Sequence, residues 1–134
     1  MKRFSILAGL ALLSSGQQLS AEPLRTIATT PGGPVYLLDI ASIRDLRDAS
    51  GPYREVRIRT DNRRSSLRGP TDQFSSDSLF RARCASGSYR IVWTDITQRN
   101  GRKRLGDRSA PARPYTQSRP ASLEADMVRA ICRA

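Results

Sequence analysis

One stretch, residues 80–93, constrains the fold more than any other, because apolar and polar residues alternate on both sides of a reversal. The apolar residues of its first half are Phe80, Ala82 and Cys84. Those of its second half are Tyr89, Ile91 and Trp93. Small residues at 85–88 lie between the halves, where a tight turn needs them. The stretch therefore predicts a β-hairpin with one apolar face, and Trp93 is expected on that face.

The two cysteines of the chain are far apart, with Cys84 on this hairpin and Cys132 near the last residue. In an exported chain, two cysteines most simply form a disulfide, which here would fasten the C-terminal segment to the hairpin. Closing a loop of this length stabilises a fold by about 4 kcal/mol in the chain-entropy account. The rival interpretation is two free thiols in a redox or metal site, but the chain has no Cys-x-x-Cys spacing and no histidine.

The N-terminus carries the pattern of a secretory signal peptide: Lys2 and Arg3, an apolar run over 4–13, and small residues before a cleavage site after Ala21. A second candidate cleavage site lies at 14–16. We expect a signal peptide at 1–21 and one domain at 22–134, in the periplasm, secreted, or on the outer surface. No cysteine lies near the cleavage site, so no lipoprotein anchor is expected. Because every carboxylate lies beyond residue 21, cleavage lowers the net charge from +11 to +9.

Periodicity along the rest of the chain predicts further strands, a terminal helix and polar connections. The expected strands lie at 25–30, 35–38, 53–60 and 102–105, the last paired with 93–98 through a turn at Asn100 and Gly101. A turn or single helical turn is expected at 39–43, and long polar connections at 61–78 and 106–119. Leu123, Met127 and Ile131 recur at helical spacing, which predicts a helix over 122–132. The predicted fold is α+β: a twisted antiparallel sheet of five to six strands with the C-terminal helix packed on it.

Three groups of residues follow one another in an order found in a known family. They are Tyr36, Asp39, Ser42 and Ile43 after a Gly-Gly turn; Cys84 with Tyr89 and Arg90 beyond it; and Pro120, Ser122 and Leu123 before Cys132. Together they resemble the surface-adhesin protein E family, small exported proteins of Gram-negative bacteria. The resemblance implies a C-terminal helix fastened to a twisted sheet by a Cys84–Cys132 bridge. The best-known relative is an outer-membrane lipoprotein that binds host matrix proteins and plasminogen, so the resemblance also implies adhesion.

The chain departs from this family at three points. Tyr115 stands where a Trp is common, Ala121 replaces a Gly, and the lipid-attachment cysteine is missing. No residue of a known adhesin site can be matched here, so none is transferred.

Residue types argue against catalysis and against a bound cofactor or metal. The chain has no histidine, and it has no Gly-x-Ser-x-Gly, phosphate-loop or metal-ligand pattern. Asp45 and Asp48 could share one face of a helix. Each lies beside an arginine, however, so we interpret them as part of a solvated surface. Asp72 and Asp77 fall in the expected polar connection, a poor place to hold two carboxyl groups in register. We therefore expect no enzyme, no cofactor and no metal.

Basic residues gather in two clusters that would suit a polyanion. The candidate residues are Arg57, Arg59, Arg63, Arg64 and Arg68 in the first cluster, and Arg99, Arg102, Lys103, Arg104 and Arg108 in the second. Arginine suits bidentate contacts with sulfate or phosphate groups. Expected ligands are therefore anionic glycans, lipopolysaccharide or extracellular DNA; export excludes cytosolic nucleic acid. The rival interpretation is a solvated arginine-rich surface. The two clusters share one edge of the sheet only if the strands that precede them point in the same direction.

The sequence thus predicts an exported, non-enzymatic binding protein of the Gram-negative envelope that takes host or envelope macromolecules. The alternative is a structural or assembly role in the periplasm, with a partner protein docked on a sheet edge. The sequence does not choose an oligomeric state.

Overall fold

The computed structural model describes residues 24–29, 31–63 and 73–134, so the expected signal peptide at 1–21 lies outside it. The elements are β1 (Leu24–Thr29), β2 (Val35–Asp39), η1 (Ile40–Ser42), β3 (Arg44–Asp48), β4 (Gly51–Asp61), β5 (Gln73–Arg83), β6 (Ser88–Gln98), β7 (Lys103–Arg104), β8 (Thr116–Gln117) and α1 (Leu123–Arg133). All of the strand pairings are antiparallel.

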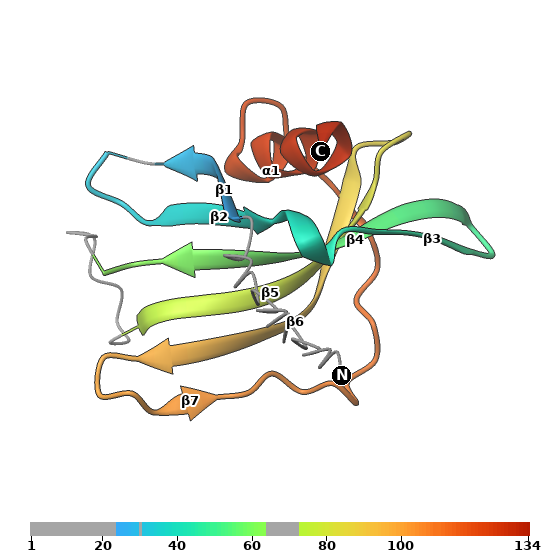
Figure 1. Ribbon diagram of the computed structural model, residues 1–134. Coiled ribbons are helices and arrows are strands. Elements are labelled where there is room, and N and C mark those ends of the chain that lie inside the picture. Colours follow the sequence, from blue (N-terminus) through green and yellow to red (C-terminus); the bar gives the residue numbers. More distant parts are fainter. Residues whose placement is uncertain (1–23, 30, 64–72) are drawn as a thin grey trace, which may run out of the picture.

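Six strands follow one another across the sheet in the order β1-β2-β4-β5-β6-β7, while β3 pairs with β4 and β8 pairs with β6 (Figure 1). Helix α1, red in Figure 1, packs on one side of this sheet and contacts β1, β4 and β5. A small α+β domain of this architecture confirms the predicted fold class. The expected pairing of 93–98 with 102–105 is also confirmed, with Ile96 opposite Arg104 and Thr97 opposite Lys103.

The hydrophobic core lies between α1 and the face of the sheet that it covers. Its buried residues come from β2, β4, β5 and the helix: Leu38, Val56, Ile58, Phe80, Ala82, Met127, Val128 and Ile131. The strand residues alternate with polar neighbours, and the helix residues recur every three to four positions, so each element has one apolar side to bury. Tyr89 of β6 stacks on Phe80, with ring centroids 6.1 Å apart, and closes one end of the core.

Both ends of α1 have specific hydrogen-bond partners. Ser122 is the N-cap, and its Oγ accepts a hydrogen bond from the Ala125 amide at 3.1 Å. At the other end, Arg54 of β4 donates from Nη1 to the carbonyl oxygens of Ile131 (3.1 Å) and Ala134 (2.8 Å). These carbonyls have no partner within a helix, so the arginine fixes the last turn of α1 to the sheet.

The disulfide predicted between the two cysteines is present. Cys84, directly after β5, is bonded to Cys132 in the last turn of α1, and their Cα atoms are 5.7 Å apart. Because 48 positions separate the two residues, the bond closes a loop that contains β6, β7, β8 and most of α1. It therefore holds the last turn of the helix against the end of the core strand β5, next to the backbone contacts of Arg54.

A β-bulge in β6 overturns the prediction that Trp93 shares a face with Tyr89 and Ile91. Ile91 lies opposite Phe80, but Trp93 lies opposite Leu79, so Val92 is an extra residue without a partner on β5. An extra residue shifts the alternation by one position, so every side chain beyond it changes face. Trp93 therefore lies on the face away from α1.

Two other expectations are wrong where polar residues form strands. Residues 73–78, expected in a connection, are the first half of β5, which places Asp77 on a rigid central strand. Residues 64–72 of that connection, with Asp72, lie outside the described residues. Asp45 and Asp48 do not share a helical face, because both belong to strand β3, which pairs with the first half of β4.

Candidate functional site

The face of the sheet that α1 leaves open is crossed by pairs of arginine and carboxylate side chains. The pairs join neighbouring strands: Arg57 to Asp39 at 3.4 Å, Arg59 to Asp77 at 2.9 Å and Arg81 to Glu55 at 2.8 Å. Alternation along β4 produces this arrangement, because Glu55, Arg57 and Arg59 point away from the core residues Val56 and Ile58. We call this surface the open face.

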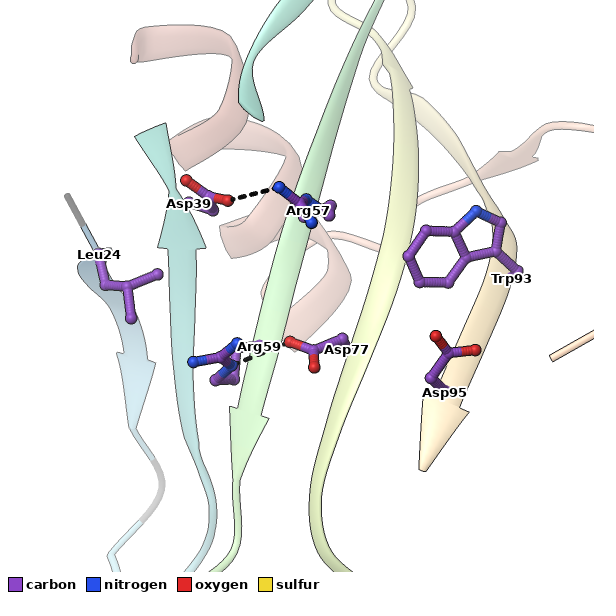
Figure 2. Close-up of a pocket in the computed structure, with 7 residues that line it drawn as sticks. All are labelled: Leu24, Asp39, Arg57, Arg59, Asp77, Trp93 and Asp95. Atoms are coloured by element: carbon purple, nitrogen blue, oxygen red, sulfur yellow. Dashed lines mark hydrogen bonds and ion pairs between the residues drawn. The ribbon is translucent and has the colours of Figure 1, made fainter. Parts of the chain in front are cut away.

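A pocket of about 130 Å³ lies in the middle of the open face. Its lining comes from five strands and consists of Leu24, Asp39, Arg57, Arg59, Asp77, Trp93 and Asp95. Figure 2 shows the Trp93 ring reaching from β6 over β5 toward Arg57, with Asp95 beside it. The pocket thus combines an aromatic ring with charged groups of both signs. We call it the open-face pocket.

Arg108, from the segment after β7, closes the β6 side of this pocket. Its guanidinium lies 4.1 Å from the centre of the Trp93 ring, and its Nη2 donates to Asp95 Oδ2 at 2.7 Å. The hydrogen bond from Arg108 and the amide of Gly106 hold the pKa of the Asp95 carboxyl below its usual range. Asp95 is therefore a carboxylate near neutral pH, and both its charge and its position are fixed.

The second candidate surface is at one end of the sheet, where the chain leaves β4 and β6. Both strands pair antiparallel with β5, so they run parallel to each other and their ends point the same way (Figure 1). Arg63, just after β4, and the β6–β7 hairpin therefore lie at the same edge. The hairpin turn depends on Gly101, whose φ of +81° suits glycine.

The hairpin carries exposed basic residues, namely Arg99, Arg102, Lys103 and Arg104. Within the described ranges, no carboxylate lies within ion-pair distance of Arg102, Lys103 or Arg104. Arg63 differs, because it binds Asp61 at 2.6 Å and stacks on Phe74 with 5.7 Å between guanidinium and ring centre. We call residues 99–104 the basic hairpin.

The structure thus places eight of the ten predicted polyanion-binding residues at two sites. Arg57, Arg59 and Arg108 line or border the open-face pocket and are paired with carboxylates. Arg63 and the basic hairpin share one end of the sheet. Arg64 and Arg68 lie outside the described residues.

No known family, curated protein or solved structure matches this chain. The similarity to the surface-adhesin protein E family therefore stays a prediction. The disulfide is consistent with an oxidising compartment outside the cytoplasm. None of the helices in the described ranges is long and apolar enough to cross a membrane. No group of three or more potential metal ligands occurs among the described residues.

Sequence reasoning identified neither the open-face pocket nor its carboxylates. Asp39 had been placed in a turn and Asp77 in a connection, and Trp93 was assigned to the opposite face. The one available signal was the alternation of Arg57 and Arg59 with buried residues, which puts both on one face of a strand. It does not reveal which carboxylates lie across from them, because that depends on the register of three strands.

A third arginine cluster on the open face surrounds two tyrosines. Tyr115 lies between the guanidiniums of Arg83 at 4.3 Å and Arg90 at 4.6 Å from its ring centre. Arg83 also binds Asp48 of β3 at 2.7 Å and lies 5.8 Å from the ring centre of Tyr53. Burial raises the pKa of the Tyr115 hydroxyl, so the ring stays neutral at ordinary pH. This cluster fastens the segment before β8 to the sheet.

Proposed function

We propose that the protein is an exported, non-enzymatic binding module of a cell envelope and that it takes polyanions on its basic hairpin. The observation that carries the proposal is the parallel course of β4 and β6, which brings Arg63 and the basic hairpin to one end of the sheet. Arg102, Lys103 and Arg104 are exposed there, and among the described residues none of them has a carboxylate within ion-pair distance. A group of exposed, uncompensated cations attracts a polyanion by releasing its condensed counterions.

The open face is a weaker candidate for polyanions, although it also contains arginines. Each of Arg57, Arg59 and Arg81 is held by a carboxylate on the neighbouring strand, so an incoming sulfate or phosphate would have to displace it. The field of a neutral pair falls off quickly with distance in salt. The basic hairpin is therefore the better site for sulfated glycans, lipopolysaccharide phosphates or extracellular DNA.

The proposal is tested on a heparin column with a variant in which Arg102, Lys103 and Arg104 are all changed to Gln. The matched control changes Arg44, Arg47 and Arg113 to Gln, because these are also exposed and the net charge falls equally. Arg44 and Arg47 lie on β3, at the opposite end of β4 from Arg63. We expect the hairpin variant to elute at clearly lower salt than the control. Equal elution of the two variants would overturn the proposal, because retention would then depend on net charge alone.

The second candidate function is assembly through a partner protein that pairs with a sheet edge. It is favoured by Ile91, which is 41% exposed, and by a cavity of about 320 Å³ along β6 between β7 and β8. Cell fractionation separates the two functions. Protein found at the outer surface or in the medium favours binding of external polyanions, as adhesion of the protein E type requires. Protein confined to the periplasm in a complex favours assembly.

A further inference from the structure

The charges around the open-face pocket balance one another. Three carboxylates, Asp39, Asp77 and Asp95, are matched by three guanidiniums, Arg57, Arg59 and Arg108. A ligand with net charge gains little from such a set and loses its own hydration when it binds. The pocket therefore favours an uncharged polar ligand, in contrast to the basic hairpin.

Two polar groups in the pocket have bonding capacity to spare. Asp77 accepts from Arg59 with Oδ1, and its side chain is 41% exposed. Arg57 Nη2 lies 3.4 Å from Asp39 Oδ2, and the Arg57 side chain is 56% exposed. Arg57 and Asp77 lie on the adjacent strands β4 and β5 but not directly opposite each other. Arg59 is the residue opposite Asp77, and Arg57 lies two residues before Arg59. Such diagonal neighbours are roughly 7–8 Å apart at their backbones, so one small ligand can reach both.

An acceptor beside a donor is the arrangement that a hydroxyl group satisfies, because it donates and accepts at once. A pair of neighbouring hydroxyls can give a hydrogen bond to the Asp77 carboxylate and take one from the Arg57 guanidinium. Asp39 also lines the pocket, and its other oxygen, Oδ1, is buried and has no hydrogen-bond donor among the described residues. Buried acceptors without partners are uncommon in folded proteins, so this one also points to a missing donor.

The apolar residues of the pocket, Leu24 of β1 and Trp93 of β6, lie at opposite ends of it, and Arg108 covers one of the two faces of the indole. The indole ring extends over β5 beside the polar groups (Figure 2). A pyranose ring has an apolar face of C–H groups and a rim of hydroxyls, so it can rest on an aromatic ring while its rim meets charged side chains. The pocket, at about 130 Å³, admits one such ring.

We infer that the open-face pocket binds one uncharged sugar residue of a glycan, with Trp93 against the ring and Asp77 and Arg57 on its hydroxyls. This site is separate from the basic hairpin and takes a ligand of different charge. Because a single ring makes few contacts, we expect a dissociation constant of about 1 mM. A longer neutral glycan offers several copies of the same sugar residue to the pocket. It therefore binds with higher overall affinity, although the pocket holds only one residue.

The chain contains a single tryptophan, so its fluorescence reports on the pocket directly. We would titrate the mature protein with chitotriose, cellotriose and maltotriose, each up to about 10 mM, and with glycylglycine as a zwitterion. We expect a saturable change in emission with at least one trisaccharide. Changing Asp77 to Ala is expected to weaken that affinity roughly tenfold, as for the loss of a hydrogen bond to a charged group.

The matched control is Asp126→Ala, since Asp126 on α1 is also an exposed aspartate paired with an arginine, Arg129. It should bind the sugar like the wild type, and so should the Gln variant of the basic hairpin. Absence of a saturable response to all three trisaccharides overturns the inference. An equal loss in Asp77→Ala and Asp126→Ala, or saturation by glycylglycine alone, also overturns it.

Discussion

The two faces of the sheet are held together by different forces. On the covered face, eight buried apolar residues pack between strands and helix, and a disulfide and Arg54 fix the helix end. On the open face, arginines and carboxylates pair across strands. The pair of Arg59 and Asp77 is partly exposed, so water and salt screen it and it contributes little to stability. Stability therefore resides on the covered face, which leaves the open face free to exchange partners with a ligand.

Removal of the disulfide should have the largest effect. Changing Cys84 and Cys132 to Ser frees the loop between them and is expected to reduce the free energy of unfolding by about 4 kcal/mol. For a domain of this size, the melting temperature should then fall by roughly 15 °C or more. Thermal unfolding followed by circular dichroism measures this fall. A change of only a few degrees would mean that the contacts of α1 hold the helix without the bond.

Single substitutions on the two faces should differ several-fold in how much they lower the free energy of unfolding. Ile131 is fully buried, so Ile131→Ala should lower the free energy of unfolding by about 3 kcal/mol through lost burial and the cavity left behind. Asp77→Ala on the open face should lower it by less than about 1 kcal/mol. Urea denaturation of both variants checks the contrast. Similar losses would show that the ion pairs contribute as much to stability as the hydrophobic core does.

The smallest effect concerns acid pH. Hydrogen bonds from Arg54, Arg83 and Arg108 lower the pKa of Asp45, Asp48 and Asp95, respectively. A lowered pKa in the folded state adds stability above the unfolded value, and this stability is lost as the pH falls through the folded value. The melting temperature should therefore stay level from about pH 8 to 5 and decline below about pH 4. A decline that begins above pH 6 would contradict this, because the chain has no histidine to titrate there.

The covered face could be predicted from the sequence, because its elements are defined by local periodicity. Val56 and Ile58 alternate with charged residues, and Met127 and Ile131 recur at helical spacing. The cysteines then allowed one intrachain disulfide between these elements. Each of these features can be read within one segment of chain.

The open face could not be predicted, because it depends on register between segments. Strand β3 has four charged residues out of five and is a strand only because β4 supplies its hydrogen bonds. The first half of β5 is polar and takes its shape from neighbours on both sides. Asp39 and Asp77 meet Arg57 and Arg59 only after these strands are aligned, so no local pattern indicates the pocket.

The extra residue at Val92 also governs how this chain can change in evolution. Loss of one residue there would exchange inside and outside for the rest of β6, turning Trp93 and Asp95 toward the helix and Thr94 and Ile96 toward solvent. A charged residue would then enter the core while the pocket lost its aromatic wall. The length of β6 is therefore coupled to the open-face pocket, because removal of residue 92 would take away its aromatic wall.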